Sequence, residues 1–154
     1  MLNENFKSAL KIIQKRLTEN NIKWAVVGST NMQLQGMNVQ PRDLDIVVRL
    51  QDLEKIREIF SDYNASGIKE LKPLTDELSW EVKAEIEGVQ VQIFGQKNTG
   101  EYVRKLLTNQ ITKIRLDNIE VPCFTLEAEA QTYSETNRKH KTQLIQEFLK
   151  QNNH

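Results

Sequence analysis

The chain has 154 residues, a length that suits one compact domain with a small helical appendage. Its 21 basic and 21 acidic residues balance, which excludes a bulk positive field for nucleic acid but leaves room for a local patch. We expect neither a signal peptide nor a membrane span, since no long apolar stretch occurs, and the single cysteine, Cys123, excludes an intrachain disulfide and fits a cytoplasmic protein.

Hydrophobic periodicity predicts a chain of mixed helices and strands. Apolar residues three or four apart indicate helices, whereas alternating apolar and polar residues indicate half-buried strands. In chain order the first predicted elements are a helix over 6–17, a strand over 23–27, a helix over 30–35, a strand over 44–48 and a helix that Asp52 can cap. A hairpin over 80–87 and 89–93 and a helix over 101–107 follow. Strands over 111–116 and 119–121 can pair as a second hairpin around residues 117–118, and a helix capped by Thr125 and a helix over 138–149 come last. The predicted fold class is α/β (α+β): a small mixed β-sheet with helices packed on one side.

A glycine ends the predicted strand over 23–27. Gly28 lets the backbone approach a ligand closely, because no Cβ intervenes. The residues after it can start a helix whose free N–H groups face the same mouth, which suits phosphate. Ser29 can donate its hydroxyl and its N–H there, or act only as a helix cap, and Asn31 lies on the first turn of the same helix.

Two aspartates open the predicted strand over 44–48. Side chains alternate faces along a strand, so Asp43 and Asp45 share one face, about 7 Å apart along the backbone. Neighbouring carboxylates repel each other unless a cation lies between them. Oxygen ligands of this kind suit Mg²⁺ held together with substrate phosphates. The pair therefore makes a candidate metal site.

Two further acidic pairs have the same spacing and serve as internal controls. Glu85 and Glu87 are expected to flank a solvated hairpin. Glu127 and Glu129 are expected to open a helix, where their charge is favourable against the helix dipole. On spacing alone, a solvated pair explains the earlier aspartates as well as a metal site does. The glycine turn that ends the preceding strand shifts the balance towards a site.

The order Gly28-Ser29, helix, Asp43-Leu44-Asp45 resembles the signature of the nucleotidyltransferase superfamily, which has a polymerase-β-like fold. The segment 121–133 and the basic stretch after it resemble the C-terminal helix region of small members. Those members include lincosamide-type antibiotic nucleotidyltransferases and small stand-alone prokaryotic proteins. The resemblance covers nearly the whole chain. It implies one nucleotidyltransferase-like domain over 1–154, with a sheet-containing core over 1–122 and C-terminal helices over 123–154.

The activity that this resemblance implies is transfer of a nucleoside monophosphate from a nucleoside triphosphate to a hydroxyl group. Asp43 and Asp45 would hold Mg²⁺, with Mn²⁺ as the alternative ion, while Gly28 and Ser29 would cradle the terminal phosphates with help from Asn31. The acceptor stays open between a small molecule, a tRNA and a protein, and so does the oligomeric state. A toxin or antitoxin component that modifies tRNA or protein is a further alternative.

Two basic features lie near this predicted site or late in the chain. Arg42 precedes the aspartates and could reach a phosphate, although an arginine before a strand is more commonly a surface residue. The basic run over 138–141 could touch a triphosphate or an RNA backbone. A solvated helix start is the more common role of such a run.

The family's third carboxylate corresponds to Gln92 in this chain. An amide offers one carbonyl oxygen to a metal but no negative charge. If the missing acid activates the hydroxyl, its loss removes a general base, typically worth ~10²–10⁴-fold in rate. Three alternatives follow. Glu81 or Glu85 substitutes from the other hairpin strand, or two aspartates suffice for a slow transfer, or the protein binds a nucleotide without chemistry. A solvated strand face explains Gln92 equally well.

Overall fold

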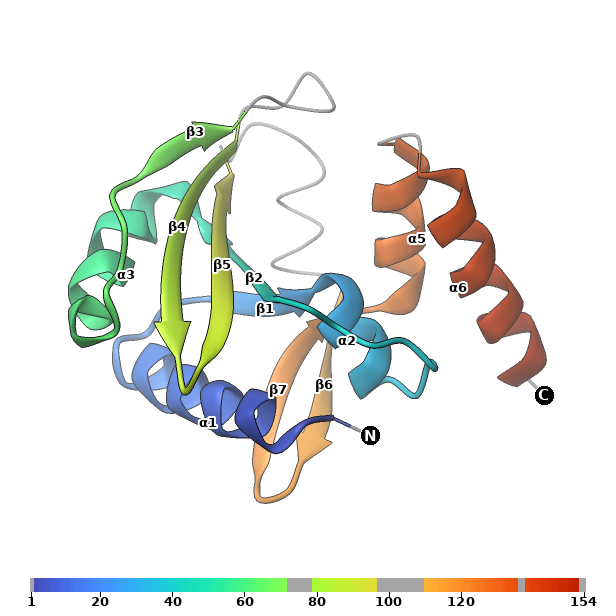
Figure 1. The fold of residues 1–154 in the computed structure, drawn as a ribbon. Coiled ribbons are helices and arrows are strands. Elements are labelled where there is room, and N and C mark those ends of the chain that lie inside the picture. Colours follow the sequence, from blue (N-terminus) through green and yellow to red (C-terminus); the bar gives the residue numbers. More distant parts are fainter. Residues whose placement is uncertain (1, 72–78, 97–109, 136–137, 153–154) are drawn as a thin grey trace.

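The computed structural model describes residues 2–71, 79–96, 110–135 and 138–152 (Figure 1). Its α-helices are α1 (Glu4–Glu19), α2 (Gly28–Leu34), α3 (Leu53–Ile59), α5 (Leu126–Glu135) and α6 (Lys139–Asn152). Its strands are β1 (Trp24–Val27), β2 (Leu44–Arg49), β3 (Lys69–Leu71), β4 (Ser79–Ile86), β5 (Val89–Gln96), β6 (Ile111–Leu116) and β7 (Ile119–Phe124). The helix predicted over 101–107 lies outside the described residues. In those residues no helix is long and apolar enough to cross a membrane.

The strands form one seven-stranded mixed sheet in the order β3-β4-β5-β2-β1-β7-β6. Strand β2 pairs antiparallel with β1 and parallel with β5, and β1 pairs parallel with β7. The hairpins β4–β5 and β6–β7 complete the two sides. Positive φ angles at Glu87, Gly88 and Asp117 make the two tight turns. The predicted α/β fold class, its mixed sheet and both hairpins are therefore confirmed.

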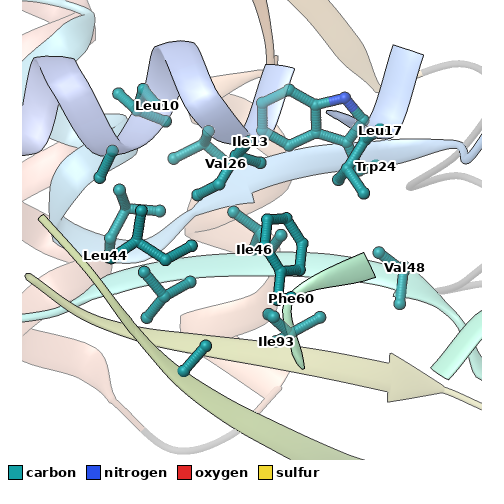
Figure 2. Close-up of a cluster of buried hydrophobic side chains, with 14 of the residues drawn as sticks. Leu10, Ile13, Leu17, Trp24, Val26, Leu44, Ile46, Val48, Phe60 and Ile93 are labelled. Carbon is teal, nitrogen blue, oxygen red and sulfur yellow. The ribbon is translucent and has the colours of Figure 1, made fainter. Parts of the chain in front are cut away.

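One face of the sheet carries the larger hydrophobic core. Strands β1, β2 and β5 contribute Val26, Ile46 and Ile93, respectively. These side chains project towards Leu10 of α1 and towards Phe60, which directly follows α3 (Figure 2). The buried residues of α1 recur at the predicted helical spacing. Burying one such side chain contributes about 1.5–3 kcal/mol. This core therefore fixes the strands whose ends carry the aspartates.

The prediction that all helices lie on one side of the sheet is wrong. Ala25 and Val47, on the opposite face, pack with Phe124 and with Ala128 of α5. The physical reason is that β1 and β2 are apolar on both faces, as strands covered on both sides are. A further cluster joins Met32 of α2 to α5 and α6, which lie side by side in Figure 1. The C-terminal helices are thus packed next to the glycine turn.

Local details test the two predicted helix caps. The N–H of Ala128 donates to Thr125 Oγ1 over 3.2 Å, so the predicted cap of α5 is confirmed. The Asp52 carboxylate makes no cap bond to α3; it accepts from Arg49 Nε over 3.0 Å instead, because a short 3₁₀ turn precedes the helix. Cys123 is buried, and burial raises the pKa of its thiol to about 12.

Candidate functional site

The glycine turn and one aspartate meet at the edge of the β1–β2 pair. Val27, the last residue of β1, pairs with Asp45 in β2, so Gly28 comes next to that carboxylate. Gly28 has φ of +74°, and a Cβ built on it would lie 3.0 Å from Asp45 Oδ2. Two independent constraints therefore require glycine here: a left-handed backbone and close approach to a carboxylate.

Asp43 lies just before β2 and is held in place through its backbone. Leu44 and Ile46 are completely buried on the core face, whereas Asp43 and Asp45 are partly exposed on the other. Thr30 Oγ1 of α2 donates to the carbonyl oxygen of Asp43 over 3.0 Å. Both predicted acids are thus on one side of the strand, close to the start of α2.

Asp45 occupies an unfavourable electrostatic position. Burial raises the pKa of its carboxyl to about 6, and the charges of Asp43 and Glu81 act in the same direction. Its Oδ1 is buried and has no hydrogen-bond partner in the described part of the chain. A buried carboxylate oxygen without a partner is destabilising unless a proton or a cation neutralises it.

The residues present fit a hard divalent cation. Asp43 and Asp45 offer carboxylate oxygens, one of them unpaired. Groups of three or more His, Cys, Asp or Glu arranged for a metal are absent from the described ranges. Mg²⁺ commonly needs only one or two carboxylates, because substrate phosphates and water complete its six ligands.

Gln92 lies beside Asp45 on the neighbouring strand. The two residues are paired in the parallel register of β2 and β5, so their side chains share one face. Glu81 of β4 is opposite Phe94 and therefore faces the same way. Its carboxylate is almost completely buried, lies 3.4 Å from Lys83 Nζ and contributes to the raised pKa of Asp45. Glu85 is farther along the strand and exposed.

Glu129 of α5 reaches the glycine turn, and the sequence did not predict this. Its Oε1 accepts the N–H of Gly28 over 2.7 Å and Nδ2 of Asn31 over 2.9 Å. Burial raises the pKa of Glu129 to about 7, although these two hydrogen bonds act to lower it. One signal was present: Glu129 falls on the apolar stripe of α5 with Leu126 and Tyr133, where an acid is unusual.

The other predicted ligand-binding residues differ in accessibility. Asn31 is 0% exposed; its Nδ2 also donates to the carbonyl oxygen of Phe124, and its Oδ1 accepts from Gln35 Nε2. A ligand contact would require this amide to leave its interior partners. Ser29 is partly exposed and Arg42 is exposed, so both can be reached from solvent.

Two basic side chains near the start of α6, Arg138 and Lys141, act electrostatically on Asp45. The Arg138 guanidinium and Lys141 Nζ are 5.8 Å and 5.1 Å from the centre of the Tyr133 ring. Both charges act to lower the pKa of Asp45, against the effects of burial and of its acidic neighbours. Part of the basic run over 138–141 therefore balances charge at the candidate site.

Comparison with known proteins gives a consistent result. A family model described as aminoglycoside-2''-adenylyltransferase matches residues 9–146. Among curated protein sequences, none matches this chain. A solved structure of a candidate nucleotidyltransferase from Thermotoga maritima is 22% identical, has a TM-score of 0.75, and aligns over 98% of this chain and 96% of that one.

Two antibiotic-modifying enzymes are also similar in structure. ANT(2'')-Ia, solved with adenylyl-2''-tobramycin, is 14% identical with a TM-score of 0.61, covering 94% of this chain and 89% of that one. The lincosamide adenylyltransferase LnuA, solved with lincomycin, is 16% identical with a TM-score of 0.60, covering 94% and 97%. At these identities the likeness concerns the fold.

The contact between Gly28 and Asp45 predicts a difference between two glycine substitutions. Gly88 has a similar φ of +76°, but a Cβ there would meet nothing closer than 3.7 Å. Gly88→Ala should lower the free energy of unfolding by about 1–2 kcal/mol from backbone strain alone. Gly28→Ala should cost at least about 1 kcal/mol more, because the methyl group also displaces the Asp45 carboxylate. Urea unfolding with a chelator present measures both; equal losses would contradict the close approach.

The raised pKa of Asp45 predicts a pH dependence of stability without divalent cations. The unfolded chain loses this proton near pH 4, whereas the folded protein keeps it to about pH 6. The free energy of unfolding should therefore fall as pH rises from about 4 to about 6, on the order of 2 kcal/mol from this group. Asp45→Asn should remove that part of the fall. Parallel pH profiles for both proteins in urea titrations would contradict the assignment.

Proposed function

Because the chain belongs to the aminoglycoside-2''-adenylyltransferase family, we propose that it transfers a nucleoside monophosphate from a nucleoside triphosphate to a hydroxyl acceptor. The observation that carries the proposal is the unpaired, buried Oδ1 of Asp45 beside the Gly28 turn. The family description and the two antibiotic-modifying structures name adenylyl transfer, which favours ATP as the donor. With such a donor, the cytoplasm is the proposed location.

Asp43 and Asp45 are the proposed ligands of Mg²⁺, with Mn²⁺ as an alternative. Bound there, the ion would neutralise the triphosphate as pyrophosphate leaves. The unpaired oxygen of Asp45 supports this role, because a cation would remove the electrostatic penalty that raises its pKa.

Ser29 is the proposed donor to the terminal phosphates. Gly28 contributes space rather than a donor, since its N–H is already bonded to Glu129. The N–H of Ser29 lies in the first turn of α2, where N–H groups lack partners within the helix. Arg138 and Lys141 would add positive charge beside the acids.

Glu81 is the proposed substitute for the family's third carboxylate. It shares the face of Asp45 and is close enough to raise its pKa, whereas Glu85 is exposed and farther along β4. As a general base it would take the proton of the acceptor hydroxyl. Small hydroxyl-bearing antibiotics are the first acceptors to test, because two similar structures hold such compounds; a tRNA or a protein acceptor comes next.

Substituting the aspartates tests the proposed reaction. With Mg²⁺ and nucleoside triphosphates labelled at the α-phosphate, we expect Asp43→Asn and Asp45→Asn to lower transfer at least about 100-fold, since metal stabilisation is worth several kcal/mol. Glu58→Gln, an exposed acid on α3, is the matched control and should transfer at the wild-type rate. Asp45→Asn should also fold well, because it removes a buried charge. Unchanged transfer in both aspartate variants would refute the proposal.

A nucleotide-binding module without chemistry is the second candidate, favoured by Gln92 in register with Asp45. Substitutions at two positions, Glu81 and Gln92, separate it from an enzyme. If Glu81 is the base, Glu81→Gln lowers kcat by ~10²–10⁴-fold while the Kd for the nucleotide changes little. If wild type binds the nucleotide but does not turn over, and Gln92→Asp or Gln92→Glu gains transfer, the module is the native state. Turnover by wild type excludes it.

A further inference from the structure

A buried acid in α5 has no explanation in the proposed chemistry. Glu129 is 2% exposed and lies on the stripe through which α5 packs against α2. An apolar residue at this position would avoid the desolvation of a carboxylate. Among the described residues, its carboxylate accepts two hydrogen bonds that offset this cost, and both come from α2: one from the N–H of Gly28 and one from the side-chain amide of Asn31.

The glycine turn is held from two sides. On one side the Gly28 N–H donates to Glu129 Oε1 over 2.7 Å. On the other, a Cβ on Gly28 would lie 3.0 Å from Asp45 Oδ2, so any side chain there would force this carboxylate to shift. The backbone of Gly28 therefore lies between two carboxylates, one on α5 and one on β2.

The remaining contacts make the position of Glu129 rigid. Asn31 Nδ2 also donates to the carbonyl oxygen of Phe124 over 3.0 Å, and Gln35 Nε2 donates to the same oxygen over 2.6 Å. This network joins α2, the end of β7 and α5 in the interior. A buried, satisfied network of this kind holds one geometry, whereas removing one member leaves others unpaired.

Resting on the proposed function, we propose that Glu129 is a positioning residue for the acid pair. It holds the Gly28 turn against Asp45 and so fixes the carboxylate that would carry the divalent cation. Helix α5 thereby supports the site through the backbone of the Gly28 turn. A displacement of about 1 Å in such supporting structure can cost about 100-fold in rate.

The first test measures the contact itself. The chain has 6 glycines, so few resonances appear when the protein is labelled with ¹⁵N-glycine. The resonance that disappears in Gly28→Ala is that of the Gly28 amide. A bond to a carboxylate moves an amide proton downfield. We expect Glu129→Gln to shift this resonance upfield and Glu129→Ala to shift it further. Glu127→Gln, an exposed acid two residues away on α5, should leave it in place.

The second test measures the site with Mn²⁺ alone, so it does not require transfer. Water-proton relaxation measures the Mn²⁺ affinity of each variant. We expect the affinity to be about 10-fold weaker in Glu129→Ala, less weakened in Glu129→Gln and unchanged in Glu127→Gln. Where transfer is measurable, kcat should fall in the same order with little change in KM for ATP. Circular dichroism and urea unfolding establish that each variant is folded.

The outcomes separate the two proposals. If the Gly28 resonance does not move, or moves while Mn²⁺ affinity is unchanged, Glu129 does not position the site. Equal effects of Glu127→Gln and Glu129→Gln on the Gly28 resonance or on the Mn²⁺ affinity would also overturn the positioning role. If wild type transfers nothing to any acceptor but Mn²⁺ affinity follows the expected order, the proposed function fails and the positioning role stands.

Discussion

The approach of a peptide backbone to a carboxylate, Gly28 against Asp45, is the constraint on which the arrangement of the site depends. It exists because β1 and β2 pair antiparallel with Val27 opposite Asp45. The core between this pair and the helices α1 and α3 fixes both strands on one face. Because this core stabilises the strands from one face, the other face can carry polar side chains near the strand ends, and Asp43, Asp45 and Gln92 lie there.

Close ion pairs balance only part of the charge at this face: Glu81 lies 3.4 Å from Lys83 Nζ, whereas Asp45 Oδ1 has no hydrogen-bond partner among the described residues. Burial raises the pKa of Asp45, the charges of Asp43 and Glu81 add to that effect, and Arg138 and Lys141 offset only part of it. Neighbouring carboxylates of this kind destabilise the folded protein when no cation is bound, and a divalent cation bound between them removes that cost. The repulsion that destabilises the cation-free site is therefore also what favours binding of a cation there.

Sequence patterns predicted the elements whose cues are local. The periodicity of α1, the turns of both hairpins and the spacing of the aspartates needed only neighbouring residues. Contacts across the fold were harder. Asn31 was predicted to help at the phosphate site from its place on the first turn of the helix, and its burial could not be predicted because its partner, Phe124, is 93 positions away in the chain. Glu129 looked like a dipole-compensating acid because its burial depends on how α5 docks.

The bond from Gly28 to Glu129 spans 101 positions along the chain. During synthesis, the strand pair that carries the glycine and the aspartates leaves the ribosome long before α5 does. β7, the parallel neighbour of β1, is also made late. Contacts of such long sequence separation slow folding, since chain entropy must be lost before they form. The Gly28 turn therefore cannot gain its contact with Glu129 until α5 has been synthesised, well after the strand pair that carries the aspartates.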